Sequence, residues 1–316
     1  MDDADLTAPT RDDIEAAADR LRGHAVRTPL LNAPSLDAEV GRRIWVKAEC
    51  LQKTGSFKFR GAYNAVSQAG SEILAYSSGN HAQGVALAAR LLGRRAVIVM
   101  PSDAPSVKIQ NTRSYGAEVV LYDRATEDRE EIGARLLSER GGALIRPYDD
   151  ARVIAGQGTC GLEIAEALPE GVTEVLVCCG GGGLSAGMAL ALDGHARVRT
   201  VEPSGFDDVA RSLVAGHPVE NAARTGSLCD AILTPMPGKL TFPILSRLAG
   251  PGMVVTDAEA LRAMALAWRH LRIVLEPGGA VALAAALFHH DGDVVAVASG
   301  GNVDGDLFVQ ALDAAA

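Results

Sequence analysis

Short apolar runs alternate with amphipathic stretches along much of the chain, most regularly between residues 72 and 145. The runs have the length of strands, and the stretches repeat their apolar positions with the period of a helix. In chain order, the strand and helix patterns occupy 73–77, 82–92, 95–100, 107–115, 118–122, 127–140 and 143–145. Strands that alternate with helices at this spacing predict parallel pairing through right-handed crossover connections.

The same pattern resumes after residue 160 and continues toward the end of the chain. Helices are predicted at 161–168, from Leu184, at 258–270 and at 279–289, and strands at 174–179, 197–202 and 294–298. Before the regular region, Thr10 and Asp13 predict a capping box that opens a helix at 14–21. An extended X-Pro segment is predicted at 26–31 and a strand at 44–48. The pattern predicts an α/β fold, and 316 residues suffice for two structural domains.

Composition and charge narrow the class of protein. Hydrophobic residues make up 48% of the chain and charged residues 22%, which is typical of a globular domain. A net charge of −9 without a basic tract argues against nucleic acid or an anionic membrane surface as a partner. No apolar run reaches membrane-spanning length, the acidic N-terminus lacks signal-peptide features, and five scattered cysteines show no metal-finger spacing. A cytoplasmic, reduced protein is expected.

One lysine, Lys58, lies where a strand pattern passes into a helix pattern. A Gly55-Ser56 turn precedes it, and a helix is predicted from Phe57 to about Val66, with the Ser56 hydroxyl as its N-cap. The positive end of the helix dipole disfavours an ammonium group and favours a neutral amine. Such an amine can act as a nucleophile and as a base.

Two further turns between a strand and a helix carry candidate binding chemistry. Gly180–Gly183 brings backbone amides together at a helix N-terminus, which is a site for phosphate. By itself this loop also fits a dinucleotide, because Glu202 follows at about the distance of a ribose-binding acid. A nicotinamide-dependent oxidoreductase therefore stays open from this loop alone. The hydroxyl, side-chain amide and backbone amide groups of Ser77–His81 suit a carboxylate.

The segment Lys53-Thr54-Gly55-Ser56-Phe57-Lys58-Phe59-Arg60-Gly61-Ala62 resembles the lysine segment of fold-type II pyridoxal-phosphate (PLP) enzymes. It is most similar to the threonine/serine dehydratase and serine racemase family, and the other motifs follow in the family's order. The resemblance implies a tryptophan synthase β-like α/β fold of two open, twisted, mostly parallel sheets flanked by helices. It further implies a large cofactor-binding domain at 1–68 and 149–316, a small substrate-cleft domain at 69–148, and a homodimer.

The resemblance also implies a role for each motif residue. PLP is expected on Lys58, with Phe57 beside its ring, Asn80 at its phenolic oxygen and Ser299 at its pyridine nitrogen. The cofactor phosphate is expected on the backbone amides of Gly180, Gly181, Gly182, Gly183 and Leu184. The carboxylate of an amino-acid substrate is expected on Ser77, Ser78, Gly79, Asn80 and His81.

A serine rather than an aspartate at the pyridine nitrogen leaves the ring neutral, which favours elimination over transamination. The expected reaction is dehydration of L-threonine or L-serine to a 2-oxo acid and ammonia, with Lys58 as the base. Ser78 matches the second base of racemases, so racemisation stays open. Ala231 follows Asp230 where threonine dehydratases have glycine. A different substrate, such as 3-hydroxyaspartate or an intermediate of hydroxyectoine breakdown, is an alternative, as is a catalytically silent relative.

Two additional features complete the candidate site. Some family members bind a cation through residues that match Glu202, the carbonyl group of Phe206 and Asp208, and such oxygen ligands suit Mg²⁺ or Ca²⁺. Arg129 begins a predicted helix and is a candidate for reaching into the substrate cleft.

Overall fold

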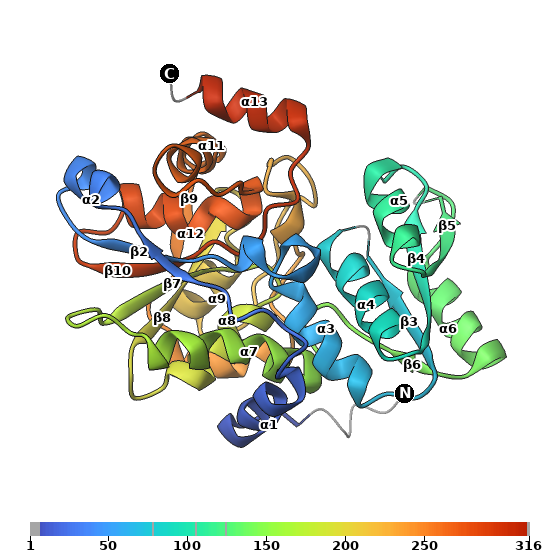
Figure 1. Cartoon of the computed structure of the whole chain (residues 1–316). Coiled ribbons are helices and arrows are strands. Elements are labelled where there is room, and N and C mark those ends of the chain that lie inside the picture. Colours follow the sequence, from blue (N-terminus) through green and yellow to red (C-terminus); the bar gives the residue numbers. More distant parts are fainter. Residues whose placement is uncertain (1–6, 78, 105, 124, 315–316) are drawn as a thin grey trace.

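The structure is a computed structural model that describes residues 7–77, 79–104, 106–123 and 125–314. Figure 1 shows two α/β parts side by side, each built around one sheet. The larger sheet has the strand order β1 (Leu30–Asn32), β2 (Ile44–Lys47), β10 (Val294–Val297), β7 (Glu174–Cys178), β8 (Arg197–Pro203) and β9 (Met253–Val255). The smaller sheet has the order β5 (Glu118–Tyr122), β4 (Arg95–Pro101), β3 (Glu72–Tyr76) and β6 (Ala143–Leu144).

Most strand pairs in both sheets are parallel. In the larger sheet β1 pairs antiparallel with β2, and the other pairs are parallel; in the smaller sheet every described pair is parallel. The predicted fold class, with two open and mostly parallel sheets, is therefore confirmed. The smaller sheet lies within 69–148, while the domain boundaries themselves stay a prediction.

Helices cover the faces of both sheets (Figure 1). The α-helices are α1 (Arg11–Leu21), α2 (Pro34–Val40), α3 (Lys58–Ser67), α4 (Asn80–Leu91), α5 (Ser106–Ser114), α6 (Arg129–Arg140), α7 (Ala151–Glu166), α8 (Gly183–Leu192), α9 (Asp208–Ala215), α10 (Thr241–Leu248), α11 (Asp257–Leu266), α12 (Pro277–Phe288) and α13 (Gly305–Asp313). Short 3-10 turns are η2 (Glu49–Leu51), η3 (Lys53–Gly55) and η4 (Asp230–Ile232), and a π-helical turn, η5 (Ala267–Leu271), follows α11. No helix in the described part of the chain is long and apolar enough to cross a membrane.

Each of the two parts is stabilised by a hydrophobic core of its own. The core of the larger part includes α12, which is apolar around its whole circumference and buried from Pro277 to Leu287. The core of the smaller part lies between α3, α4 and the strands β3 and β4. Because each sheet has its own core, the space between the two parts is available for a binding site.

Helix α7 is longer than the sequence pattern predicted. Its first half contains Gly156 and Gly158, residues that lower helix propensity and hide the period. In the structure these glycines permit close helix packing, since a Cβ on Gly156 would lie 2.7 Å from the carbonyl oxygen of Arg60 in α3. Packing between α7 and α3, and not local helix propensity, therefore determines that this segment is helical.

The start of α3 also differs from the prediction. The predicted capping box of Thr10 and Asp13 is present at α1, but Ser56 is not the N-cap of α3. Its Oγ is buried without a hydrogen-bond partner among the described residues, and its backbone forms an isolated bridge with Gly300. Lys58 is still the first residue of the helix, so the predicted position at the helix N-terminus is confirmed.

Candidate active site

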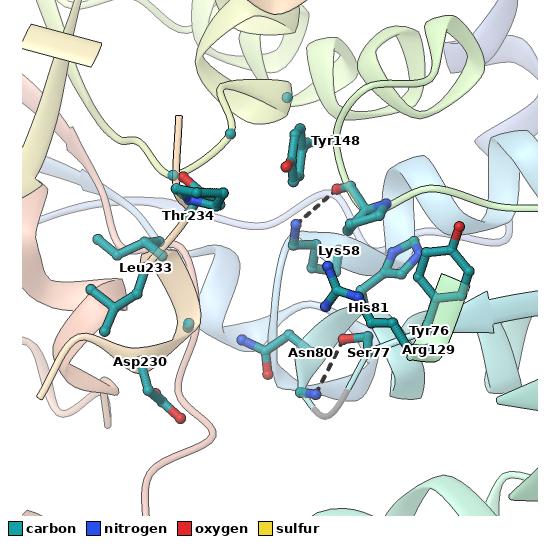
Figure 2. Close-up of a pocket in the computed structure, with 18 of the residues that line it drawn as sticks. Lys58, Tyr76, Ser77, Asn80, His81, Arg129, Tyr148, Asp230, Leu233 and Thr234 are labelled. Atoms are coloured by element: carbon teal, nitrogen blue, oxygen red, sulfur yellow. Dashed lines mark hydrogen bonds between the residues drawn. The ribbon is translucent and has the colours of Figure 1, made fainter. Parts of the chain in front are cut away.

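A cavity of about 590 Å³ is lined by residues of both parts of the molecule (Figure 2). Its volume is in the range of small-molecule and cofactor sites. Of the residues predicted from the sequence, it brings together Phe57, Lys58, Ser77, Gly79, Asn80, His81, Arg129, Gly180, Gly181, Gly182, Gly183 and Leu184. The first and last of these residues, Phe57 and Leu184, are more than 120 positions apart, so their convergence is a property of the fold.

Lys58 points into this cavity from the N-terminus of α3. Its Nζ donates a hydrogen bond to the carbonyl oxygen of Pro147 at 2.9 Å and lies 5.1 Å from the ring centroid of Phe57. Burial lowers the pKa of the Lys58 amine to about 8, although nearby Cys178 and Glu276 act in the opposite direction. A substantial fraction of this amine is therefore neutral near physiological pH, as a nucleophile or base requires.

The glycine loop lies at the N-terminus of α8. Gly182 adopts the left-handed conformation with φ 90° and provides no side-chain cap, so among the described residues no side chain caps the first amides of α8. A Cβ on Gly181 would overlap the ring of Tyr148, and one on Gly180 would lie 2.9 Å from the Ile232 carbonyl oxygen. Thr241 Oγ1 donates to the Gly181 carbonyl at 2.6 Å and fixes the loop.

This loop fits a phosphate group. Uncapped amides at a helix N-terminus bind anions through hydrogen bonds and the helix dipole. The absence of side chains lets a phosphate approach the backbone directly. The predicted amide donors, Gly180 to Leu184, all line the cavity that holds Lys58.

The predicted carboxylate-binding segment forms the turn before α4. The Gly79 amide donates to Ser77 Oγ at 3.2 Å, and α4 begins at Asn80. Ser78, the predicted second base, lies outside the described residues. His81 is buried in the first turn of α4, and its Nε2 lies 2.9 Å from the Ile145 carbonyl oxygen. Burial lowers the pKa of His81 to about 4, so this ring is neutral and tethers α4 to the chain after β6.

Asn80 is held by two residues that the sequence analysis did not single out. Its Nδ2 donates to Glu276 Oε1 at 2.6 Å, and its Oδ1 accepts a hydrogen bond from Asn302 Nδ2 at 2.7 Å. Asn302 Nδ2 also donates to the Thr54 carbonyl at 2.8 Å, so both of its N–H groups are used. The arrangement fixes the orientation of the Asn80 amide and leaves one N–H for a ligand, as expected for a residue that meets a phenolic oxygen.

Glu276 is a functional candidate that sequence reasoning missed. It precedes Pro277 at the start of α12, lines the cavity and is 4% exposed. Burial raises the pKa of its carboxyl group to about 7, although the hydrogen bond from Asn80 lowers it. Only the tertiary structure reveals this burial, because nothing in the sequence around Glu276 distinguishes it from an exposed acid.

Ser299 follows β10 and is fixed by its backbone. Its amide donates to the Gly279 carbonyl at 3.3 Å, and its own carbonyl accepts from the Phe57 amide at 3.0 Å. Its side chain is 3% exposed, and its Oγ accepts a hydrogen bond from Cys178 Sγ at 3.1 Å. Cys178 lines the cavity that contains Lys58, whereas Ser299 is not among the lining residues and contacts the cavity wall through Cys178.

Cationic side chains lie at the outer part of the cavity. Arg129, the first residue of α6, holds its guanidinium 5.7 Å from the ring centroid of Tyr76 (Figure 2). Within the described part of the chain, no carboxylate forms an ion pair with Arg129. Lys108 of α5, by contrast, pairs with Asp230 of η4 at 2.9 Å and joins the two parts of the molecule. Arg129 is therefore a cation that remains available to a ligand anion.

The predicted cation ligands Glu202, Phe206 and Asp208 are not among the residues that line the cavity. Both oxygens of Glu202 accept hydrogen bonds, from the Val209 amide at 2.9 Å and from the Ala210 amide at 2.7 Å. Asp208 accepts from Asn221 at 2.6 Å through Oδ1, while its buried Oδ2 has no partner among the described residues. The described residues contain no group of three or more His, Cys, Asp or Glu side chains arranged to hold a metal.

Comparison with known proteins gives a consistent result. Residues 21–300 match the family model described as pyridoxal-phosphate dependent enzyme. The chain is 42% identical to the L-threo-3-hydroxyaspartate ammonia-lyase of Pseudomonas sp, over 95% of this chain and 97% of that protein. It is 39% identical to the serine racemase of Arabidopsis thaliana, over 92% of each chain.

Solved structures agree with the fold. The crystal structure of threonine deaminase from T.th. has a TM-score of 0.88 and 43% identity, and the match covers 94% of this chain and 99% of that one. Maize serine racemase has a TM-score of 0.89 and 36% identity, with 97% and 98% covered. These related proteins differ in the reaction or substrate that their names give.

Proposed function

Because the chain belongs to the pyridoxal-phosphate dependent enzymes of fold type II, in the group of threonine deaminases, serine racemases and hydroxyaspartate ammonia-lyases, we propose that it is an ammonia-lyase. The proposed reaction removes water from a 3-hydroxy amino acid and gives a 2-oxo acid and ammonia. The observation that carries the proposal is the Lys58 amine, whose pKa is lowered to about 8 in the cavity that also holds the glycine loop. The glycine loop is thus part of a PLP enzyme. It is not part of a nicotinamide-dependent oxidoreductase, the alternative that the sequence of the loop by itself left open.

The residues of the cavity suit PLP. Lys58 would hold the cofactor covalently, the amides of Gly180 to Leu184 would bind its phosphate, and the free N–H of Asn80 would meet its phenolic oxygen. When bound, the cofactor withdraws electrons from the substrate α-carbon. Ser299, the residue expected at the ring nitrogen, carries a hydroxyl and not a carboxylate, which supports elimination over transamination.

Lys58 is the proposed base for the α-proton. The carbonyl oxygen of Pro147 accepts a hydrogen bond from its Nζ at 2.9 Å and orients the amine inside the cavity. The turn at Ser77, Gly79 and Asn80 would hold the substrate carboxylate, so that the α-carbon faces the amine. His81 is not proposed as a base, since its ring is committed to the Ile145 carbonyl.

The position of Arg129 supports a substrate with a second carboxylate. Its guanidinium lies in the cavity over Tyr76 and has no carboxylate partner in the described part of the chain. A distal carboxylate pairs with arginine through charge-assisted hydrogen bonds. We therefore place 3-hydroxyaspartate ahead of L-threonine and L-serine, which have no second negative charge to offer.

Replacing Lys58 with alanine tests the cofactor and the base together. Purified wild-type protein should be yellow, and borohydride should attach the cofactor to Lys58 irreversibly, as peptide mapping can show. The Lys58→Ala variant should lose the visible absorbance of the lysine-bound cofactor and all lyase activity. An unchanged spectrum in this variant would exclude Lys58 as the attachment site.

A substrate panel tests the proposed specificity. We expect kcat/KM for L-threo-3-hydroxyaspartate to exceed the values for L-threonine, L-serine and D-serine. The Arg129→Ala variant should lose about 10- to 100-fold in kcat/KM for 3-hydroxyaspartate and little for serine, since a charged hydrogen bond contributes about 1.5–3 kcal/mol. Arg135→Ala is the matched control, because Arg135 is exposed on the same helix. Equal losses on all substrates would contradict the role of Arg129.

Racemisation and a cation are tested in the same assays. The chirality of the remaining amino acid should stay unchanged if elimination is the main reaction, and an inverted product would favour a racemase.

The Mg²⁺ or other cation predicted at Glu202, Phe206 and Asp208 stays a prediction. Activity that falls after EDTA treatment and returns with Mg²⁺ would support it. The predicted homodimer can be checked by sedimentation.

A further inference from the structure

Two adjacent strands end at the same edge of the cavity with a thiol and a hydroxyl in contact. Cys178 is the last residue of β7, and Ser299 follows the parallel neighbour β10. Cys178 Sγ donates to Ser299 Oγ at 3.1 Å, and each residue is 3% exposed. Cys178 lines the cavity that contains Lys58. One partner of the contact, Cys178, is therefore part of the wall of the proposed cofactor site.

Apart from the sulfur of Cys178, the hydroxyl proton of Ser299 has no acceptor in the described part of the chain. Its Oγ is occupied as an acceptor by the thiol, and its amide and carbonyl are bound to Gly279 and Phe57. A buried hydroxyl carries one donor and normally uses it. The remaining donor is therefore available to a ligand in the cavity.

The thiol is suited to remain a donor. Burial raises the pKa of Cys178 to about 11, against the opposing effects of Ser299 and Lys58, so the proton stays on sulfur at physiological pH. The Cys178 carbonyl accepts from Ser185 Oγ at 3.0 Å, which fixes the backbone. The adjacent Cys179 belongs to a different core cluster, and its Sγ donates to the Gly180 carbonyl. Of these two neighbouring cysteines, Cys178 is the one that contacts Ser299.

We propose that Cys178 is a positioning residue that directs the Ser299 hydroxyl proton toward the ring nitrogen of the bound cofactor. The inference rests on the proposed function, since it needs PLP in the cavity. A hydroxyl that accepts one hydrogen bond becomes a better donor in the next, because chains of hydrogen bonds polarise one another.

Infrared spectroscopy of the holoenzyme tests the contact directly. The S–H stretching band of Cys178 is identified by its loss in Cys178→Ala, with Cys160→Ala as the control for a fully buried thiol elsewhere. In Ser299→Ala this band should move to the frequency of a weaker hydrogen bond. If the band stays unchanged in Ser299→Ala, the thiol does not donate to Ser299 and the inference is overturned.

The effect on the cofactor gives a second readout. In Cys178→Ala, the absorption maximum of the lysine-bound cofactor and its dependence on pH should shift in the same direction as in Ser299→Ala. The value of kcat should fall about fivefold, the equivalent of one ordinary hydrogen bond, while KM stays within about twofold because the substrate does not contact Cys178. Cys178→Ser, which restores a donor, should recover most of the spectrum.

The outcomes separate this inference from the proposed function. A protein without any visible cofactor band would refute the proposed function, whereas the infrared band would still report the contact between thiol and hydroxyl. If the visible cofactor band is normal in the wild type and shifts in Ser299→Ala but not in Cys178→Ala, the positioning role of Cys178 is overturned while the proposed function stands. A shift in both variants, with recovery in Cys178→Ser and no shift in Cys160→Ala, is the expected result.

Discussion

At the scale of single residues, Glu276 shows how burial changes chemistry. Its carboxyl group accepts a hydrogen bond from Asn80 at 2.6 Å inside the cavity, and its pKa is raised to about 7. The folded state therefore holds this proton more tightly than the unfolded chain does. The stability contributed by the protonated carboxyl is full below the ordinary pKa of 4.5 and is lost as the pH rises through about 7.

The substitution Glu276→Gln tests this assignment. Glutamine keeps an oxygen that accepts from Asn80 but cannot ionise. The variant should be more stable than the wild type at pH 8, by up to about 3 kcal/mol, and the advantage should shrink toward pH 5. Thermal denaturation across this range measures the difference. Glu220→Gln is the control, because that side chain is 60% exposed. A stability advantage over the wild type that is no larger at pH 8 than at pH 5 would contradict the raised pKa of Glu276.

At the scale of elements, the loop between β7 and α8 depends on the absence of side chains. Gly181 lies against the ring of Tyr148, and a Cβ there would overlap that ring. We expect Gly181→Ala to displace the loop and to weaken binding of PLP, because the amides at the start of α8 no longer converge.

Titration of the apoenzyme with PLP, followed by absorbance, measures this effect. The dissociation constant should rise by at least about tenfold, since repacking against a fixed ring costs about 1–3 kcal/mol. Gly70→Ala is the matched control, because a Cβ at Gly70 meets nothing within 4 Å. Equal affinities in the two variants would show that Tyr148 moves aside and that the loop tolerates a methyl group.

At the scale of the whole molecule, a buried charge cluster joins distant segments near Lys58. Arg60 of α3 forms paired hydrogen bonds with Glu49 at 2.8 Å, and it also pairs with Glu163 of α7 at 2.7 Å. Lys47 of β2 pairs with Glu163 as well. Two positive and two negative charges balance in the interior, which anchors the helix that begins at Lys58.

The Arg60→Met variant should lose about 3–5 kcal/mol of stability, because it leaves Glu49 buried without its partner. Urea denaturation of the holoenzyme checks the loss. Arg22→Met removes an ion pair whose side chains are 79% and 74% exposed, and it should cost less than about 1 kcal/mol. If both variants lose the same small amount, the cluster does not stabilise the fold.

Much of the fold was predictable because periodicity is a local property of the chain. The strands and helices between β3 and β6 were predicted within a few residues of their observed bounds. The first half of α7 was not predicted, since glycines obscured it, and the predicted Ser56 cap of α3 was wrong, since a backbone bridge to Gly300 replaced it. In both places packing with distant segments overrode local propensity.

The sequence by itself determined the family, the alternation of strands and helices, and the motifs that supply Lys58, the glycine loop and the Ser77–His81 turn. These features depend on neighbouring residues, so they can be read along the chain. Only the tertiary structure decided that Glu276 and Cys178 line the cavity and that Asn302 holds Asn80, because burial and hydrogen bonds between residues more than 100 positions apart exist only after the two sheets pack around one cavity.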